Sequence, residues 1–454
     1  MKKKKLLAML LCMATAVSFT ACSKDKPVTE QTGEETALYD DVWDGTYNGE
    51  EVLDVDQTIE EESYNFTGTN RNGLVIKDSR VSFKKLGIVK NSDSTRIREA
   101  AVTKGLGAAC FVTNGTLLVD EGNISTDAAG ATGVFSFTEA NADMTSMTIN
   151  TAGVYAPGVE SAGGGSATLS ESTVTTEGRE AAGVRCMDVN SYVYAGDSKI
   201  ETKGKNSPGV YAGASVDLSN CEITAYSSEV LRFSGLAGTW TENCTLTGNK
   251  TGTNANDFNW TVIACADEKP GEDECAELYF VTSTLTSHSG GLFYATNTNC
   301  AFYIDNCELV NSESEDDYLL RCQGNNDLWG RKGTNGAKCK FVLGGTDAKG
   351  GVYYDSSSEL NFYVTNMCDF TGFVKKDEKF VPEAGTGHCT IGIQDGCKWI
   401  VTQSSEFENL ECCGEIVDEE GKAVTVKGKD GTVYMEGDSD ITVTVDTFSE
   451  VVDY

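Results

Sequence analysis

The sequence predicts an all-β chain built as a stack of short coils, on two observations. The first is a repeat in which Gly-Val recurs after small residues, with the glycine at positions 133, 158, 183 and 209, in steps of 25, 25 and 26 residues. The second is that short β-forming runs, separated by Gly, Asn, Ser and Asp, continue through the body without a long helical periodicity. A unit of this length cannot bury its own apolar face, so neighbouring units must stack.

The first segment predicts export and a membrane tether. Residues 2–5 are lysines, residues 6–17 form an apolar run, and Phe19-Thr-Ala-Cys22 follows with small residues before a cysteine. This segment resembles a bacterial lipoprotein signal peptide, which implies removal of residues 1–21 and lipid attachment at Cys22. We therefore expect an extracytoplasmic protein anchored at the bacterial cell surface. An ordinary secretory signal or an uncleaved helix is the alternative.

The charge of the chain excludes some partners. The net charge is −33, and loss of the four lysines of residues 1–21 lowers it to −37. Such an acidic surface repels nucleic acid and anionic lipid headgroups. No cofactor is expected, although exposed carboxylates such as those between Asp267 and Glu274 would bind Ca²⁺ weakly.

The chain divides by composition into a tether, a body and a tail. Residues 22–44 are polar and acidic and are predicted to form a flexible spacer. Residues 45–445 hold the β segments: irregular first coils to residue 90, a weak helical signal over 95–104, regular coils over 106–247, and coils with longer turns beyond. Residues 424–445 are expected to form the last coils or a cap, and residues 446–454 a C-terminal tail.

The repeat pattern also carries a resemblance. Coils of about 22–30 residues, with small residues before an apolar position and Asn, Ser, Thr or Cys at the turns, resemble a right-handed parallel β-helix. This is the fold of the pectin-lyase-like superfamily and of many bacterial surface proteins, including adhesins. The resemblance covers most of residues 45–445 and rests on the repeat, because no catalytic signature accompanies it.

The cysteines predict an internal ladder. Of 17 cysteines, 15 lie beyond Cys22. Several follow an Asn before an apolar residue, and serine or threonine takes the same place in other coils; the expected members are Cys221, Cys244, Cys307 and Cys368 with Ser172, Ser198 and Thr284. A second ladder is expected at Cys186, Cys265 and Cys322. Reduced core thiols are the favoured state, while disulfides remain open for the pairs Cys265–Cys275, Cys322–Cys339 and Cys389–Cys397. Zinc is disfavoured because no Cys-x-x-Cys is present.

A ligand groove is predicted on the strand that follows the small residues. If Val184, Leu231, Ile263, Phe293, Leu320 and Tyr353 point inward, the next residue of each coil points outward. The predicted outward column is Arg185, Tyr211, Arg232, Ala264, Tyr294, Arg321 and Tyr354. Guanidinium groups bind carboxylates, and aromatic faces stack on sugar rings. Trp240, Trp260 and Trp329 lie in or beside longer turns that follow this strand. Ordinary solvated strand residues are the alternative interpretation.

Catalytic signatures are incomplete. Polygalacturonase-type enzymes carry Asn-Thr-Asp, Asp-Asp, Gly-His-Gly and Arg-Ile-Lys, whereas this chain has Asn297-Thr-Asn299, Asp316-Asp317 and Gly387-His388-Cys389 and lacks the last motif. Glycoside hydrolysis needs two positioned carboxylates, so this match is read as chance. A polysaccharide lyase would use Arg185, Arg232 or Arg321 as base, but no carboxylate cluster singles one out. No serine triad, P-loop or dinucleotide motif is found.

The sequence thus favours a non-enzymatic role at the cell surface, as an adhesin-like binder or a rigid stalk. Glycans are the expected ligands, bound by Arg185, Tyr211, Arg232, Tyr294, Arg321, Tyr354, Trp240 and Trp329, with a surface protein as the other partner considered. A carbohydrate-active enzyme of the pectin-lyase-like superfamily, lyase or hydrolase, is the alternative. Fold analogy alone does not decide between them.

Overall fold

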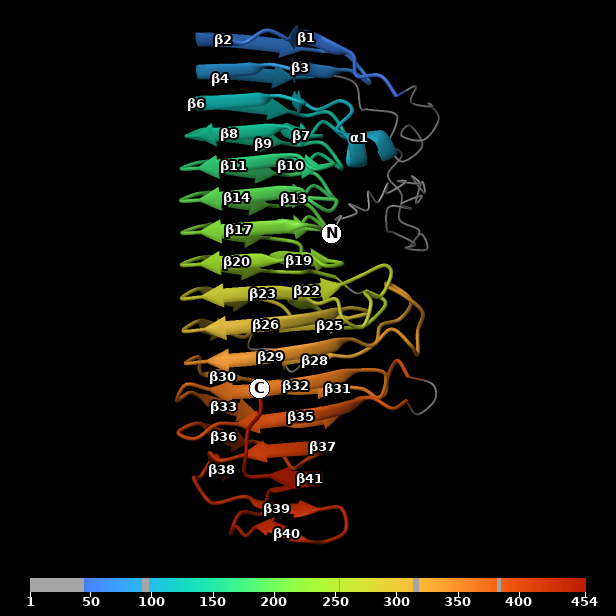
Figure 1. The fold of residues 1–454 in the computed structure, drawn as a ribbon, viewed down its shortest axis with the longest axis vertical. Coiled ribbons are helices and arrows are strands. Elements are labelled where there is room, and N and C mark those ends of the chain that lie inside the picture. The colour runs from blue at the N-terminus through green and yellow to red at the C-terminus, as the bar shows by residue number, and fades with distance from the viewer. Residues whose placement is uncertain (1–44, 92–97, 253, 313–317, 382–384) are drawn as a thin grey trace, which may run out of the picture.

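The fold is a parallel β-helix, described from a computed structural model. The structure describes residues 45–454 except 92–97, 253, 313–317 and 382–384. Each regular coil contributes one strand to each of three rows, and strands in a row pair in parallel with the coils above and below (Figure 1). We call these rows face A, face B and face C. Within the described residues, no helix is long and apolar enough to cross a membrane.

Face A is a 13-stranded sheet. Its strands, from one end of the stack to the other, are β1 (Gly49–Leu53), β3 (Asn72–Lys77), β5 (Cys110–Thr113), β7 (Val134–Phe137), β10 (Val159–Ala162), β13 (Val184–Cys186), β16 (Val210–Ala212), β19 (Leu231–Ser234), β22 (Trp260–Cys265), β25 (Gly291–Thr296), β28 (Tyr318–Cys322), β31 (Gly351–Tyr354) and β34 (Val374–Lys376). Helix α1 (Arg98–Lys104) lies beside this face (Figure 1).

Face B begins with long strands and continues with shorter ones. Its strands are β2 (Gln57–Phe66), β4 (Arg80–Lys90), β6 (Thr116–Thr126), β8 (Asn141–Thr145), β11 (Ser166–Ser170), β14 (Tyr192–Gly196), β17 (Ser215–Ser219), β20 (Thr239–Glu242), β23 (Ala276–Val281), β26 (Asn299–Asp305), β29 (Lys338–Gly344), β32 (Glu359–Thr365), β35 (His388–Ile393) and β37 (Ser405–Cys412). Strand β6 pairs with both β8 and β9, so the long strands serve faces B and C together.

Face C holds the third strand of each coil. Its strands are β9 (Met147–Thr151), β12 (Thr173–Thr176), β15 (Lys199–Thr202), β18 (Glu222–Ala225), β21 (Thr245–Gly248), β24 (Thr284–Ser287) and β27 (Glu308–Val310). In the lower coils a separate four-stranded sheet follows, with β30 (Ala348–Lys349), β33 (Asp369–Gly372), β36 (Lys398–Val401) and β38 (Glu415–Asp418).

The lower end is closed by strands whose order in space differs from their order in the chain. Strand β41 (Thr442–Ser449) pairs with β37 on one side and with β39 (Thr425–Gly428) on the other. Strand β40 (Val433–Met435) then pairs antiparallel with β39 at the outermost position. The antiparallel hairpin ends the regular addition of coils. Residues 424–445, expected to form the last coils or a cap, thus hold this hairpin and the beginning of the parallel strand β41.

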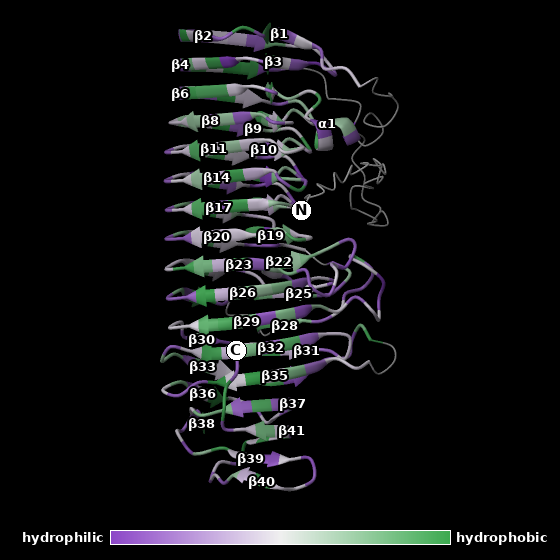
Figure 2. Ribbon diagram, viewed as in Figure 1, coloured by the Kyte–Doolittle hydropathy of each residue, from purple (hydrophilic) through white to green (hydrophobic). Residues whose placement is uncertain are grey.

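One continuous core of buried apolar residues extends through the coils of the stack, and apolar residues recur along the strands of successive coils (Figure 2). The repeated Gly-Val explains the local packing. Val159 and Val184 point inward and are fully buried. A Cβ on Gly158 would overlap Val174, and one on Gly183 would overlap Ile200. The glycine is therefore needed for the approach of a branched side chain from face C, which fixes one register for successive coils.

The predicted serine and cysteine ladder is present at the turn between faces B and C. The backbone N–H of Cys221 donates to Cys244 Sγ at 3.4 Å, and that of Cys244 donates to Ser283 Oγ at 3.0 Å. The member of that coil is Ser283, so the expectation of Thr284 was wrong by one residue. Asn220, Asn243 and Asn306, which precede ladder cysteines, have φ near +50°, a conformation that asparagine tolerates. This explains the Asn-Cys pairs.

The second predicted cysteine ladder is not formed. Cys186 and Cys322 share an inward row of face A but are separated by Ala212, Phe233, Ala264 and Ala295. Cys265 falls in the neighbouring outward row, beside Ser234. The structure contains the cysteines of the described residues as free thiols. Burial raises the pKa of Cys110 and of Cys186 to about 12, so these thiols are poor nucleophiles.

Candidate ligand-binding faces

The arginine and tyrosine column of face A is largely as predicted. Arg185, Tyr211 and Arg232 are register partners on consecutive strands, and Tyr294 and Arg321 continue the same outward row. We call this the face A row. Two members differ from the prediction: Ile263 stands in the row where Ala264 was expected, and Tyr353 stands where Tyr354 was expected.

The two errors have different causes. Ile263 is fully buried although it points outward, because other segments cover this part of face A, so apolar character no longer marks the inward side. Tyr354 follows the run Gly350-Gly351 at the same distance as Tyr294 follows Gly290-Gly291, and this match placed Tyr354 in the predicted row. The register shifts by one residue between Tyr318 and Leu320 against β31, which turns Tyr354 inward, where it is fully buried.

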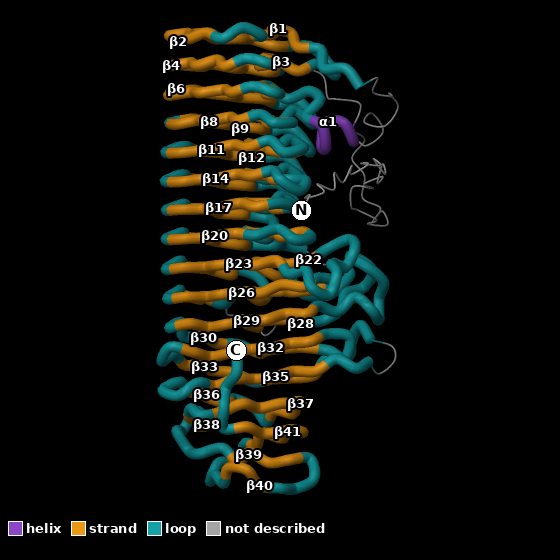
Figure 3. The backbone as a smooth tube through the Cα atoms, viewed as in Figure 1, coloured by secondary structure: helices purple, strands orange, loops and turns teal. Residues whose placement is uncertain are grey.

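Face A is covered by loops of the same chain. These loops are long beside β22–β31 and short beside β10–β19 (Figure 3). Phe258, Trp329 and Phe380, from three different loops, join Trp260 and Tyr294 in an apolar cluster outside the main core. Tyr294 is fully buried and Trp329 is 7% exposed. The predicted groove is thus filled there by side chains of the protein itself.

The uppermost arginine of the row makes a buried ion pair. Arg185 donates from Nε and Nη2 to the two carboxylate oxygens of Glu160, at 2.8 and 2.6 Å, and from Nη2 to Val102 O in helix α1 at 2.9 Å. Glu160 is fully buried. Burial raises the pKa of Glu160 to about 7, although Arg185 opposes the shift. This pair holds α1 against face A.

The central arginine belongs to a larger charged cluster. Arg232 Nε lies 3.1 Å from Glu229 Oε1, and Lys250 Nζ lies 2.7 Å from Glu229 Oε2. Although burial alone would raise it, the two cations together lower the pKa of Glu229 to about 2. The guanidinium of Arg232 also lies 5.6 Å from the ring centroid of Tyr211 and 5.4 Å from that of Trp329.

The lowest arginine is enclosed by rings. Arg321 Nη1 lies 3.1 Å from Asp377 Oδ2 and donates to Gln323 Oε1 at 2.9 Å. Its guanidinium lies 4.1 Å from the ring centroid of Tyr353 and 4.8 Å from that of Tyr318. Each arginine of the row therefore has a carboxylate partner within the chain. Tyr211, Arg232, Arg321 and Tyr353 are the partly exposed members of the row.

The two asparagines of the hydrolase-like motif make structural hydrogen bonds. Asn297 donates from Nδ2 to Ala266 O at 2.6 Å, and Asn299 does so to Gly271 O at 2.7 Å. Both side chains thus brace the loop that follows β22. His388 begins β35 on face B, and Asp316-Asp317 lie outside the described residues. Among the described residues, no three His, Cys, Asp or Glu side chains are arranged to hold a metal ion.

A second candidate lies on the outward side of face B. Trp240, Tyr279 and Tyr303 are register partners on β20, β23 and β26. The rings of Trp240 and Tyr279 are 5.4 Å apart between centroids, and those of Tyr279 and Tyr303 are 4.7 Å apart and stacked. Trp240 is 47% exposed. We call Tyr194, which lies two strands above Trp240, and these three residues the aromatic row.

The tail covers the lower continuation of the aromatic row. Tyr363, in the same row, donates from its hydroxyl to Asp453 O at 3.1 Å, and its ring lies 5.6 Å from that of Tyr454. The N–H of Asp453 donates to Glu411 Oε2 at 3.1 Å. Tyr363 is consequently only 6% exposed. The tail was predicted as a segment, but this contact was not.

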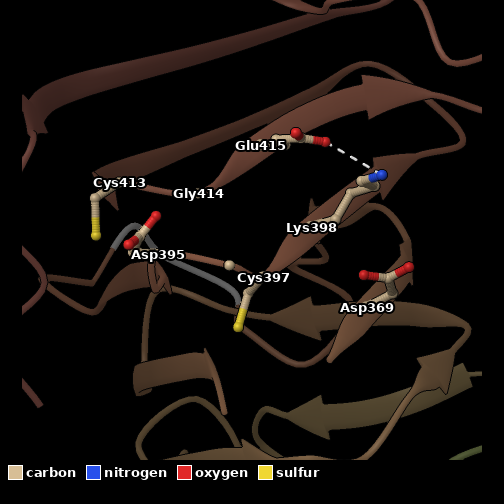
Figure 4. A pocket seen from close by; sticks show the side chains of 8 residues that line it. Asp369, Asp395, Cys397, Lys398, Cys413, Gly414 and Glu415 are labelled. Carbon is tan, nitrogen blue, oxygen red and sulfur yellow. Dashed lines mark ion pairs between the residues drawn. The ribbon is translucent and has the colours of Figure 1, made fainter. Parts of the chain in front are cut away.

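A small pocket of about 340 Å³ lies at the turns around β36 and β38 (Figure 4). Its lining includes Asp369, Asp395, Cys413 and the ion pair between Lys398 Nζ and Glu415 Oε2 at 3.2 Å. The charges present are thus partly neutralised within the chain. A second depression of about 400 Å³ lies on β4, β6 and β9, around Lys85 and Glu121.

Sequence reasoning found Trp240 and missed Tyr279 and Tyr303. The available signal was a tyrosine between two core residues at matching places, in Leu278-Tyr-Phe280 and Phe302-Tyr-Ile304. The alternation of a half-buried strand puts both tyrosines outward. No protein-family model matches this chain, and no curated protein shows significant similarity to it.

Proposed function

We propose that this chain is a lipid-anchored bacterial surface protein that binds polysaccharide on the aromatic row without cleaving it. The observation that carries the proposal is the exposed Trp240, supported from below by the stacked rings of Tyr279 and Tyr303. Aromatic side chains are costly to leave in water and are enriched where a ligand covers them. The signal-like segment that ends at Cys22 supports the location, and lies outside the described residues.

The face A row supports this role less well. Arg185 and Arg321 pair with Glu160 and Asp377 and are largely buried. A ligand carboxylate would have to displace these partners and leave a buried acid without a cation, which costs several kcal/mol (about 3–5). Tyr211, Arg232 and Tyr353 are partly exposed and remain as the part of this row that a ligand could reach.

The enzymatic alternative is a polysaccharide lyase with Arg232 as base. A base must give up its proton, whereas Glu229 at 3.1 Å favours the charged guanidinium. This geometry supports binding over catalysis.

The test is binding of the full-length chain, in mild detergent, to a panel of immobilised polysaccharides, with release of reducing and unsaturated ends measured in the same wells. Trp240→Ala should weaken binding about tenfold, because a stacked ring contributes roughly 1–1.5 kcal/mol. Tyr226→Ala is the matched control, since Tyr226 is also 47% exposed but lies after β18, outside the aromatic row. Equal binding by Trp240→Ala and the parent chain would refute the proposed site, and product release would establish the enzyme instead.

A further inference from the structure

The outward row of face B that contains the aromatic row has two interruptions. In register order the row reads Tyr194, Asp217, Trp240, Tyr279, Tyr303, Val342 and Tyr363. Rings occupy every position but two, at Asp217 and at Val342. Because adjacent strands are about 4.8 Å apart, each interruption separates two aromatic residues by about 9.6 Å.

The interruption at Val342 lies next to the C-terminal segment, which contacts Tyr363. Val342 is only 7% exposed. The ring of Tyr454 lies against that of Tyr363, and Lys340 Nζ lies 5.8 Å from the ring centroid of Tyr303 and 5.8 Å from that of Tyr454. A ring of the C-terminal segment therefore lies against Tyr363, next to this interruption, and Lys340 lies near the rings on both sides of it.

The interruption at Asp217 has the same width and is polar. The carboxylate accepts the hydroxyl of Tyr192 at 2.9 Å and the backbone N–H of Trp240 at 2.9 Å. A carboxylate has about four acceptor sites, so Asp217 is held in place and retains acceptor capacity. Among the described residues, the ring of Trp240 contacts the ring of Tyr279, which lies on the side of Trp240 away from Asp217.

We infer that this interruption binds one uncharged pyranose ring of a glycan, stacked against Trp240 and hydrogen-bonded through its hydroxyls to Asp217. The inference rests on the proposed function and names its ligand class. Stacked rings prefer centroid separations of about 4.5–7 Å, so one ring fits between positions about 9.6 Å apart. The hydroxyl groups of the sugar can donate hydrogen bonds to the carboxylate of Asp217, whose position is already fixed by two other donors.

Charge decides against acidic sugars at this place. Glu242 lies two residues after Trp240 on β20, and its Oε2 accepts Trp240 Nε1–H at 3.3 Å. The two carboxylates and the net charge of −33 repel a uronate. The chain should therefore favour neutral glycans over acidic polysaccharides.

The experiment titrates the full-length chain, by calorimetry, with three soluble probes: neutral hexose oligosaccharides, uronate oligosaccharides of equal length, and a peptide with the tail sequence Val-Val-Asp-Tyr. The neutral oligosaccharides should bind at least tenfold more tightly than the uronates. Asp217→Leu should weaken neutral binding about tenfold, and Asp217→Asn should retain it while narrowing the discrimination against uronates. Thr168→Leu, two strands above in the same row and partly exposed, is the control and should have no effect.

The outcomes separate the inference from the proposed function. Loss of binding in Trp240→Ala with full binding in Asp217→Leu would overturn the inference and leave the proposed function standing. Uronates that bind as tightly as neutral sugars, or the peptide binding in place of sugars, would overturn it as well. If no polysaccharide binds in the immobilised panel, the proposed function fails with it. Amide exchange of β17 and β20 in each variant checks that the fold is retained.

Discussion

Removal of Arg185 should strongly destabilise the upper coils. In Arg185→Met the apolar stem is kept, but Glu160 remains fully buried without its cation, and Val102 O loses a donor. Breaking one partner of a buried pair costs about 3–5 kcal/mol. Since 1.4 kcal/mol is a factor of ten, the local opening equilibrium of β10 and β13 should increase between about 100-fold and a few thousand-fold.

The appropriate assay is amide hydrogen exchange with mass spectrometry, because a stacked array opens locally instead of unfolding in one step. Peptides from β7 to β16 should lose protection, while peptides from β35 onward should not. The loss should be larger at pH 8 than at pH 6, since an unpaired buried carboxyl is stable only when protonated. Lys203→Met is the control: it removes a surface pair with Glu177 in which both side chains are at least half exposed, worth under about 1 kcal/mol.

A second substitution distinguishes the charge from the packing. Arg185→Met combined with Glu160→Leu should recover much of the lost protection, because no charge is then left in the interior. Unchanged exchange in the single variant would refute the reasoning, since it would mean that Glu160 is solvated or that α1 does not cover it.

Three further predictions follow from the same contacts. Because the pKa of Glu160 is raised to about 7, its contribution to the free energy of unfolding is present below about pH 4.3 and is lost as the pH rises through 7. In Glu160→Gln, the free energy of unfolding measured with urea should no longer fall over this pH range. The pKa of Glu229 is lowered to about 2, so its effect on stability has the opposite pH dependence. The contribution of Glu229 to the free energy of unfolding is present above about pH 4.3 and is lost as the pH falls towards 2. Glu229→Gln should abolish this loss of stability in acid. In the ladder, Cys244→Ser should change the free energy of unfolding by no more than about 0.5 kcal/mol, because a serine, Ser283, already fills the next position. Cys244→Val removes the acceptor of the Cys221 N–H and should cost about 1–3 kcal/mol. A serine variant as unstable as the valine variant would contradict the hydrogen-bonding role.

The register of the regular coils could be predicted because a single residue type carried it. Gly158 and Gly183 leave space for Val174 and Ile200, so the spacing of glycines in the sequence is the spacing of coils in the stack. Where loops cover the outer side, this information is lost. Ile263 is apolar because Phe258 and Trp329 lie over its side of the sheet. No periodic pattern in the local sequence indicates such contacts between distant loops.

The binding residues were predicted less completely for a related reason. Arg185 and Arg232 were placed in one row with Tyr211 because each arginine follows a residue expected to point inward, Val184 or Leu231. The partners of the two arginines, Glu160 and Glu229, were not predicted. Tyr279 and Tyr303 lie in coils of different length, so their alignment with Trp240 appears only when the strands are paired. Composition indicates which residues are available, whereas side-by-side placement depends on the lengths of the intervening turns.

The position of β41 between β37 and β39 has a consequence for how the molecule is assembled. Upper coils can add one after another as the chain emerges, because each strand pairs with one already in place. The lower edge of β37 cannot be completed by the next segments to appear, since its partner is residues 442–449. Until those residues arrive, β37 is an open strand edge, and β39 and β40 have only each other. Closure of the stack is therefore a late, long-range event, and a chain interrupted before residue 442 exposes a site for pairing with another molecule.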